Sequence, residues 1–393
     1  MRDILSKRTL VLSMPELLSL KPFIDGHVHL REPGSNKAET IESGTRAASE
    51  GGVGAVADMS NNAPLPTIDE ERVLEKHSII EEEANINVGT AVGMQPEYDN
   101  VPQLCRALPL SIFVKAYGGP TTNIDRETDY EAYEFDEHLD GIKQVDPDKL
   151  VVFHSGNDNY RDFIGHAAQD RGLRVRLAHV NKMDQVQAVL EARAKGLEVS
   201  SAICPHTMLL TLRERLTRSA FADMKPDLVG EAEADELFDA FVRGDIQELE
   251  TDHAPHSIES KMNAVMQNPT CAGEHQGRCC GVPSLEHAAS VMFWQVRIGR
   301  LPLERLVEAY STIPAYNMRL KSHRGSYVRW DMSDPYRIDE SRDVVSQSGW
   351  SPYVGMMAVG RVVDMRLGNT SIIENYEHVG RARRVVMGRG EAI

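Results

Sequence analysis

The sequence of 393 residues contains no apolar run that approaches the roughly 20 residues needed to cross a bilayer. Five charged residues interrupt its first 20 positions, and the apolar run Leu10 to Leu12 is too short for the core of a signal peptide. The composition, 41% hydrophobic and 26% charged, is typical of a globular protein in water. We therefore expect a cytoplasmic protein with no membrane partner.

Cysteine is scarce, and its spacing matches no structural motif. The five cysteines form no C-x-x-C pair; they are Cys105, Cys204, Cys271, Cys279 and Cys280. An odd number without such a pair argues against a disulfide framework and against a zinc ribbon. Reduced thiols are expected.

Basic residues are outnumbered, 43 against 59 acidic residues, which gives a formal net charge of -16. A surface of this sign repels polyanions, so a nucleic-acid partner is not expected. An anionic small substrate would have to be held by a few local cations, and Arg31 is the first candidate.

The pattern along the chain predicts an α/β protein. From about Pro22 onward, short β-branched runs alternate with segments of helical period, as in repeated βα units. Eight strands are expected, at 23–30, 53–57, 86–92, 112–116, 150–154, 174–180, 197–203 and 247–251. Helices are expected at 37–50, 69–83, 126–144, 160–171, 182–195 and 232–243. Eight such strands close into a (β/α)8 TIM barrel, which needs roughly 250 residues.

An open doubly wound sheet is the competing architecture. It would normally carry a glycine-rich turn after its first strand, whereas Gly51-Gly52-Val53-Gly54 precedes a strand. The barrel is therefore favoured.

The rest of the chain predicts a cover for the barrel and a small β appendage. Segment 254–283 is rich in Pro, Gly and Cys and is expected to be a loop over the barrel mouth, followed by helices at 284–298 and 302–320. Short β pieces are expected at 327–330, 358–365 and 384–387, with 9–12 as a further strand. The predicted domains are an N-terminal segment 1–21 that joins the appendage, the barrel 22–323 and the C-terminal β appendage 324–393.

A pair of histidines ends the first strand, in Ile24-Asp25-Gly26-His27-Val28-His29-Leu30-Arg31. Side chains alternate along a strand, so His27 and His29 face the same side and can share one metal ion. A lone histidine on a strand is usually a core or surface residue, but packing does not explain a pair that is followed at once by Arg and Pro-Gly.

Further residues able to bind metal fall at the ends of other predicted strands: Lys115, His154, His179 and Asp252. In barrels, chemistry is assembled at the C-terminal strand ends. Four histidines and a carboxylate exceed the three protein ligands of a simple open zinc site, so two metal ions are predicted.

Two of these residues have alternative roles. A neutral Lys115 can take up carbon dioxide to form a carbamate that bridges two metals, or its ammonium group can reach solvent or pair with a carboxylate. Asp252 can bind a metal and also act as general acid and base, or be a ligand alone. Water bridging two metals ionises near neutral pH and can attack an amide carbonyl.

The run from His27 to Gly34, together with Lys115, His154, His179 and the segment 252–256, closely resembles class I dihydroorotases of the amidohydrolase superfamily. The resemblance extends from about Pro22 to Leu320. It implies the reversible cyclisation of N-carbamoyl-L-aspartate to L-dihydroorotate in pyrimidine biosynthesis. It also implies two Zn²⁺ ions bridged by carboxylated Lys115 and hydroxide, with His154 and His179 on the second metal and Asp252 as general acid and base.

The same resemblance implies a set of substrate contacts. They are Arg31, Asn61 and His256 at the substrate carboxylate, Thr121 in a loop over the substrate, Gly281 in a backbone-contact loop, and Lys225, where relatives carry Arg or Asn. The chain has Ser60-Asn61-Asn62 where the family has Pro-Asn-Thr, so either asparagine can face the substrate. Lys225 can instead be solvent-exposed, and His206 is taken either as structural or as a support behind the residues that bind metal and substrate.

Two other functions stay open. A hydantoinase, dihydropyrimidinase or allantoinase would use the same metals, but a neutral ring needs no carboxylate clamp of the Arg31 type. An inactive scaffold for aspartate transcarbamoylase would usually have lost metal ligands. The resemblance also implies a homodimer and a complex with aspartate transcarbamoylase.

Overall fold

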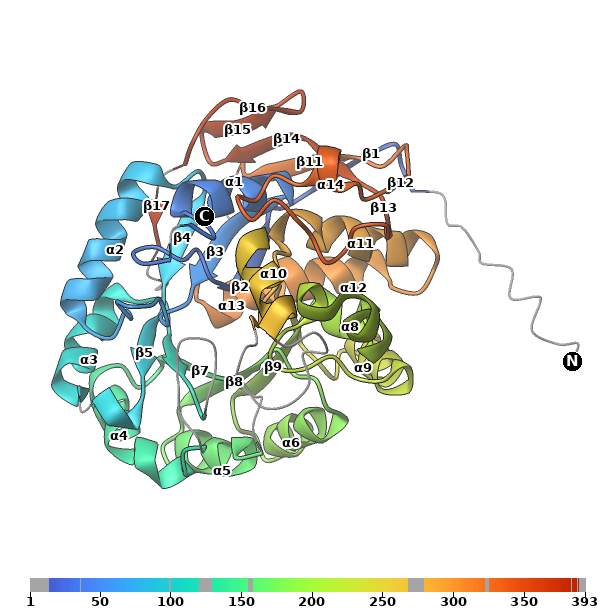
Figure 1. The fold of residues 1–393 in the computed structure, drawn as a ribbon. Coiled ribbons are helices and arrows are strands. Elements are labelled where there is room, and N and C mark those ends of the chain that lie inside the picture. Colours follow the sequence, from blue (N-terminus) through green and yellow to red (C-terminus); the bar gives the residue numbers. More distant parts are fainter. Residues whose placement is uncertain are drawn as a thin grey trace, which may run out of the picture.

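The computed structural model describes residues 14–35, 37–98, 100–119, 129–154, 158–267, 279–321, 325–382, 384–386 and 388. Within these ranges parallel strands form a barrel ringed by helices (Figure 1). The barrel strands are β2 (Phe23–Val28), β3 (Val53–Asp58), β4 (Asn87–Thr90), β5 (Val92–Met94), β6 (Val114–Ala116), β7 (Leu150–His154), β8 (Arg174–Ala178), β9 (Val199–Ile203) and β10 (Glu248–Leu249).

The strands pair as two sheets that meet end to end. One has the order β17-β4-β3-β2, in which β17 is Arg384–Val385, and the other has the order β10-β9-β8-β7-β6-β5. Only Ala91 separates β4 from β5, so these two pieces occupy one barrel position. At the opposite seam, parallel bridges join Val28 to His253 and His253 to Val282. The predicted (β/α)8 barrel is confirmed.

The helices begin and end where local chemistry requires. Thr40 caps α1 (Ile41–Glu50) by accepting a hydrogen bond from the backbone N–H of Ser43, and Asp69 caps α2 (Glu70–Glu83) in the same way. α9 (Glu231–Arg243) ends at the C-cap residue Gly244, whose φ of 84° is left-handed. Helices that cover the barrel are α1 (Ile41–Glu50), α2 (Glu70–Glu83), α3 (Val101–Ala107), α4 (Asp136–Val145), α5 (Tyr160–Ile164), α6 (Met183–Ala194), α9 (Glu231–Arg243), α11 (Leu285–Arg297), α12 (Leu303–Val307) and α13 (Ile313–Asn317). None of the helices in the described ranges is both long and apolar enough to cross a membrane.

Segment 254–283 is not only a loop, as the sequence predicted. It contains α10 (Ile258–Gln267), which buries Lys261 and Ala264 on one face, three residues apart. The shorter helices α7 (Pro205–Leu209) and α8 (Leu212–Arg218) were also not predicted. Ala264 of α10 packs against Ala220 in the turn Ser219–Ala222 that follows α8, and Figure 1 shows α10 in front of the barrel. This part of the chain therefore has regular structure next to the strand ends.

An antiparallel sheet flanks the barrel. It has the order β1 (Leu17–Leu20), β11 (Tyr327–Asp331), β14 (Arg361–Leu367), β15 (Thr370–Glu374), β16 (Glu377–His378). The smaller elements β12 (Tyr336–Arg337), β13 (Met357–Ala358) and α14 (Glu340–Asp343) connect β11 to β14. β1 pairs with β11, and the predicted strand 9–12 lies outside the described residues.

The C-terminal piece of the predicted appendage pairs with the barrel instead. β17 (Arg384–Val385) runs parallel to β4, and the backbone N–H of Val386 donates to the carbonyl of Val88 at 2.9 Å. Val386 is fully buried among Ile24, Phe113 and other interior side chains. The division of the chain into domains stays a prediction, but residues 384–386 are part of the barrel.

Trp330 on β11 links the appendage to the barrel. It is fully buried and packs against Phe23 and Phe293, with ring centroids 6.0 and 5.0 Å away. Gly52 lies against the indole: a Cβ at this position would be 2.1 Å from Cζ2 of Trp330, and its φ is +68°. The contact therefore requires glycine at position 52.

Gly52→Ala is expected to lower the free energy of unfolding by about 2–5 kcal/mol, because it adds left-handed strain to a clash with Trp330. Gly196→Ala is the matched control: its φ is +81°, but no atom lies within 4 Å of its Cβ position. It should cost only about 1–2 kcal/mol. Urea unfolding of both variants measures the difference, and equal losses would contradict the packing argument.

Candidate metal-dependent active site

The predicted site residues meet at the C-terminal ends of the barrel strands. His154 continues the inward phase of Leu150 and Val152 on β7, and Lys115 on β6 continues that of Phe113, the residue before β6. One cavity is lined by His27, His29, Arg31, Asn61, Lys115, Tyr117, His154, His179, Lys225, Asp252, Ala254, Cys280 and Gly281. All six predicted metal ligands therefore face one space.

Three of them form a compact group. Oδ1 of Asp252 lies 3.4 Å from Nε2 of His27 and 3.2 Å from Nε2 of His29. One ligand atom from each of the three residues lies within 4.8 Å of the others. Two imidazoles and a carboxylate are a donor set typical of zinc.

A second pair lies next to this group. Nδ1 of His154 is 3.0 Å from Nε2 of His179, and the rings of His179 and His27 are 5.0 Å apart. Burial lowers the pKa of each of these three histidines well below its usual range, and the same holds for His29. Burial therefore favours the neutral form of all four imidazoles, which is the form that binds metal.

Lys115 lies between the two groups as a buried amine. It is 1% exposed, and its Nζ makes no hydrogen bond within the described part of the chain. Burial lowers its pKa to about 8, which favours the neutral amine that reacts with carbon dioxide. Burial also raises the pKa of Asp252 to about 8. A buried amine without a hydrogen bond among neutral histidines fits a metal-bridging carbamate.

Left-handed backbone conformations occur at three of the predicted site residues. Arg31, His179 and Asp252 have φ values of 67°, 37° and 44°. Such values are costly for residues other than glycine and are concentrated at functional sites. At His179 the reason is visible: Ala178 faces the barrel interior, so a regular strand would turn the next side chain outward.

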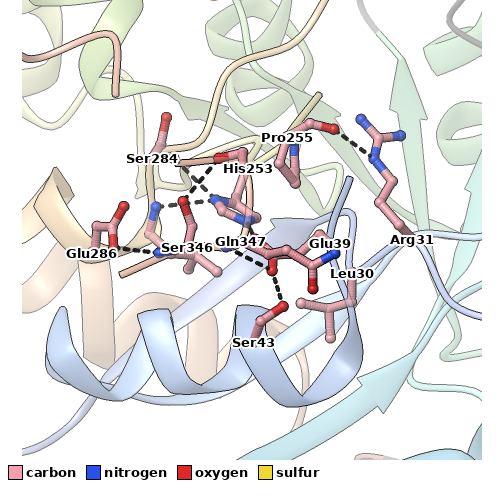
Figure 2. Close-up of polar contacts among 12 residues, drawn as sticks. Leu30, Arg31, Glu39, Ser43, His253, Pro255, Ser284, Glu286, Ser346 and Gln347 are labelled. Atoms are coloured by element: carbon pink, nitrogen blue, oxygen red, sulfur yellow. Dashed lines mark hydrogen bonds and ion pairs between the residues drawn. The ribbon is translucent and has the colours of Figure 1, made fainter. Parts of the chain in front are cut away.

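The segment after Asp252 is held by a buried histidine (Figure 2). Nδ1 of His253 accepts the backbone N–H groups of Ser284 and Leu285 at 3.0 and 3.3 Å, so its Nε2 carries the hydrogen and faces Glu39 at 3.4 Å. Its backbone carbonyl accepts the N–H of His29 at 2.7 Å. His253 therefore connects the first metal group to the start of α11.

Arg31 is fixed on the same segment. Its Nε donates to the carbonyl of Pro255 at 3.1 Å (Figure 2), which leaves the two Nη groups for a ligand. Nε2 of His256 donates to the carbonyl of Cys280 at 2.8 Å and lies 3.5 Å from Nη2 of Arg31. His256 is therefore adjacent to Arg31, as the predicted clamp requires.

Asn61 and Asn62 have different environments. Asn61 lines the cavity, whereas Nδ2 of Asn62 donates to the carbonyl of Glu32 at 2.7 Å. Lys225 also lines the cavity and is not simply solvent-exposed. His206 is 3% exposed and is not among the lining residues.

The predicted substrate contacts Gly281 and Thr121 have different outcomes. Gly281 lines the cavity, but its N–H already donates to the carbonyl of Asp223 at 2.9 Å, so only its carbonyl can contact a ligand. Thr121 lies outside the described residues. Sequence reasoning missed Tyr117, which lies two residues after Lys115 and shares the same inward phase, and it missed Glu250.

Comparison with known proteins shows that the chain is similar to dihydroorotases. A family model described as dihydro-orotase-like matches residues 17–100. The dihydroorotase of Bacillus cytotoxicus is 26% identical over 375 residues, which cover 86% of this chain and 82% of that protein. The dihydroorotase of Shouchella clausii is 28% identical and covers 77% and 74%. Over most of its length the chain is therefore similar to curated dihydroorotases, which are proteins of the amidohydrolase type. The predicted resemblance is confirmed.

Solved structures agree on the fold. An L-hydantoinase (dihydropyrimidinase) from Arthrobacter aurescens has a TM-score of 0.81 at 19% identity and covers 95% of this chain and 88% of that one. The inactive dihydroorotase-like domain of a CAD-like multifunctional protein from Chaetomium thermophilum has a TM-score of 0.73 at 13% identity, with 92% and 96% covered. At these identities the likeness shows the barrel fold alone.

Proposed function

We propose that this chain, a cyclic amide hydrolase by its curated relatives, catalyses the reversible cyclisation of N-carbamoyl-L-aspartate to L-dihydroorotate in pyrimidine biosynthesis. One observation carries the proposal: Arg31 and Asn61 line the same cavity as the His27, His29 and Asp252 group. A cyclic amide whose ring carries a carboxylate needs a guanidinium near its reacting bond, whereas a neutral cyclic amide does not.

The residues fit two zinc ions. His27, His29 and Asp252 would hold one and His154 and His179 the other, with carboxylated Lys115 shared between them. Zinc would supply Lewis acidity, which acidifies water and polarises a carbonyl.

Asp252 carries the proton in this proposal. In hydrolysis its carboxylate accepts a proton from the attacking water and delivers it to the ring nitrogen as the carbon–nitrogen bond breaks. In cyclisation the protonated carboxyl group assists the loss of water. Cyclisation removes one carboxylate from the substrate and therefore takes up one proton.

The substrate would be held at its other end by side chains. Arg31 can bind the carboxylate with both Nη groups, and Asn61 adds a neutral donor. His256 lies beside Arg31 and Lys225 adds a second cation to the cavity. The carbonyl of Gly281 can accept a ring N–H, and Thr121 stays a predicted contact.

The alternatives differ at defined points. A hydantoinase, dihydropyrimidinase or allantoinase would leave Arg31 without a carboxylate to bind. An inactive scaffold, comparable to the inactive dihydroorotase-like domain from Chaetomium thermophilum, would not need the six predicted metal ligands that line this cavity. A homodimer and a complex with aspartate transcarbamoylase stay predictions.

Arg31→Ala is expected to lower kcat/KM for L-dihydroorotate by at least about 10²-fold, because it removes two charge-assisted hydrogen bonds. Arg31→Lys is the matched control: it keeps the charge but loses the fork geometry, so its loss should be smaller. Turnover of 5,6-dihydrouracil by each variant measures the reacting groups alone, because this neutral ring has no carboxylate for residue 31 to bind. If Arg31→Ala left kcat/KM for dihydroorotate unchanged, the clamp assignment would be wrong.

The two directions are expected to have opposite pH profiles. Burial raises the pKa of Asp252, which favours the protonated carboxyl needed for cyclisation below that pKa and the carboxylate needed for hydrolysis above it. Hydrolysis should therefore rise and cyclisation fall from about pH 6 to about pH 9. Initial rates in both directions measure this, and parallel profiles would contradict the role of Asp252.

A further inference from the structure

Glu250 is a buried carboxylate next to the predicted metal ligands, and the proposed reaction does not use it. Glu250 follows β10, two residues before Asp252, and is 1% exposed. Its Oε1 accepts the backbone N–H of His179 at 2.7 Å and lies 3.3 Å from Nδ1 of His27. One oxygen atom therefore contacts a residue from each of the two ligand groups.

Arg176 forms an ion pair with the carboxylate of Glu250. Its Nη2 lies 3.4 Å from Oε2 of Glu250 and donates to the carbonyl of Gly26 at 2.8 Å, while its Nη1 lies 3.1 Å from Oε2 of Glu248. The guanidinium is fully buried. A Cβ at position 26 would lie 2.5 Å from Nη1, so the glycine before His27 makes room for this cation.

The contact with His27 selects one form of its ring. A carboxylate oxygen only accepts hydrogen bonds, so it favours the tautomer in which Nδ1 carries the hydrogen. Nε2 then keeps its lone pair, and this atom faces Oδ1 of Asp252 at 3.4 Å. Hydrogen-bonding a ligand histidine through its other nitrogen fixes its tautomer and ring orientation.

The contact with His179 acts on the backbone. His179 has a φ of 37°, and this left-handed conformation turns its ring inward beside His154. The hydrogen bond from its N–H to Glu250 is short and fully buried. An anionic acceptor here stabilises the conformation on which the second ligand pair depends.

We propose that Glu250 is a positioning residue that aligns His27 of one metal group and His179 of the other through a single carboxylate oxygen. The inference rests on the metal centre of the proposed function, and it goes beyond that function by assigning a role to a residue that touches neither metal nor substrate. Arg176 fixes Glu250 in turn.

Glu248 provides a matched control within the same network. It is as buried as Glu250 and pairs with the same arginine. It also accepts hydrogen bonds from Ser200 and Asn317, on the side of the network away from the histidines. Glu248→Gln therefore removes the same charge from the same cation without touching a metal ligand.

The test is the zinc affinity of the purified full-length protein, measured by competition with a chelator after metal removal, together with the melting temperature of each metal-free variant. Glu250→Gln is expected to bind zinc about 10–100-fold more weakly than the parent. Glu248→Gln should stay within about threefold of the parent. An unchanged affinity for Glu250→Gln, or an equal loss in both variants, would overturn the proposal.

Glu250→Asp keeps the proposal testable if the glutamine variant does not fold. It retains the negative charge facing Arg176 but shortens the side chain by one methylene, which draws the oxygen away from both histidines. Zinc binding weakened by about tenfold or more is expected, and binding equal to the parent would overturn the proposal. No substrate enters this measurement, so a parent protein that binds zinc but does not hydrolyse dihydroorotate would refute only the proposed function.

Discussion

Replacing Asp252 with asparagine is expected to lower kcat for dihydroorotate hydrolysis by about 10²–10⁴-fold, the contribution of a positioned general acid and base. The amide cannot accept the proton from water, and its oxygen is a weaker ligand beside His27 and His29. The loss should occur in both directions, because the same group returns the proton during cyclisation. Steady-state rates in both directions, with the zinc content of each preparation, measure this effect.

Glu286→Gln is a suitable control for the loss of a buried carboxylate. Glu286 is 6% exposed, accepts backbone N–H groups from Val345 and Ser346, and does not line the cavity. Figure 2 shows its contact with Ser346. Its kcat should change by less than about threefold, since an amide oxygen accepts the same hydrogen bonds. If Asp252→Asn retained kcat within about tenfold of the parent while zinc content was unchanged, Asp252 would not be the general acid and base.

Lys115→Ala is expected to lower kcat by about 10³-fold or more, because metal assistance supplies several kcal/mol and each 1.36 kcal/mol is a factor of ten. The truncated side chain leaves a buried space at the point where a carboxylate is needed. Formate or acetate is small enough to enter it and supply two oxygens. Partial recovery of kcat with rising formate concentration is therefore expected.

Lys115→Met separates a missing carboxylate from a missing amine. Methionine fills much the same volume as lysine, so formate should not restore its activity. Rescue of alanine but not methionine supports a carbamate at Lys115. Full activity of either variant without added carboxylate would show that Lys115 has no part in the metal centre.

Much of the fold could be predicted because the strands and the helices of the barrel have different periods of apolar residues in the sequence. The strand that ends at His154 alternates between interior residues Leu150 and Val152 and outward residues that pack under the helices. A histidine in the inward phase at a C-terminal strand end has to face the barrel mouth. The strand period alone therefore brings Lys115 and His154 to one space.

Other features depend on contacts between distant segments. β17 lies near residue 385 in sequence but beside residue 88 in space, and no local pattern shows that it enters the barrel. The inward turn of His179 requires a positive φ, which strand periodicity does not predict. In the sequence, Glu250 looks like a surface residue at the polar end of a strand. Its partner Arg176 is 74 positions away, and only the closed barrel brings the two side chains together.

The central claim is that Arg31 makes this metal site specific for a ring that carries a carboxylate. The most direct measurement compares kcat/KM of the zinc-loaded protein for L-dihydroorotate with that for 5,6-dihydrouracil, which lacks only the carboxylate. We expect dihydroorotate to be preferred by at least about 10²-fold, the value of a two-pronged charge-assisted contact. Equal turnover, a preference for dihydrouracil, or no turnover of either ring by zinc-loaded protein would contradict it.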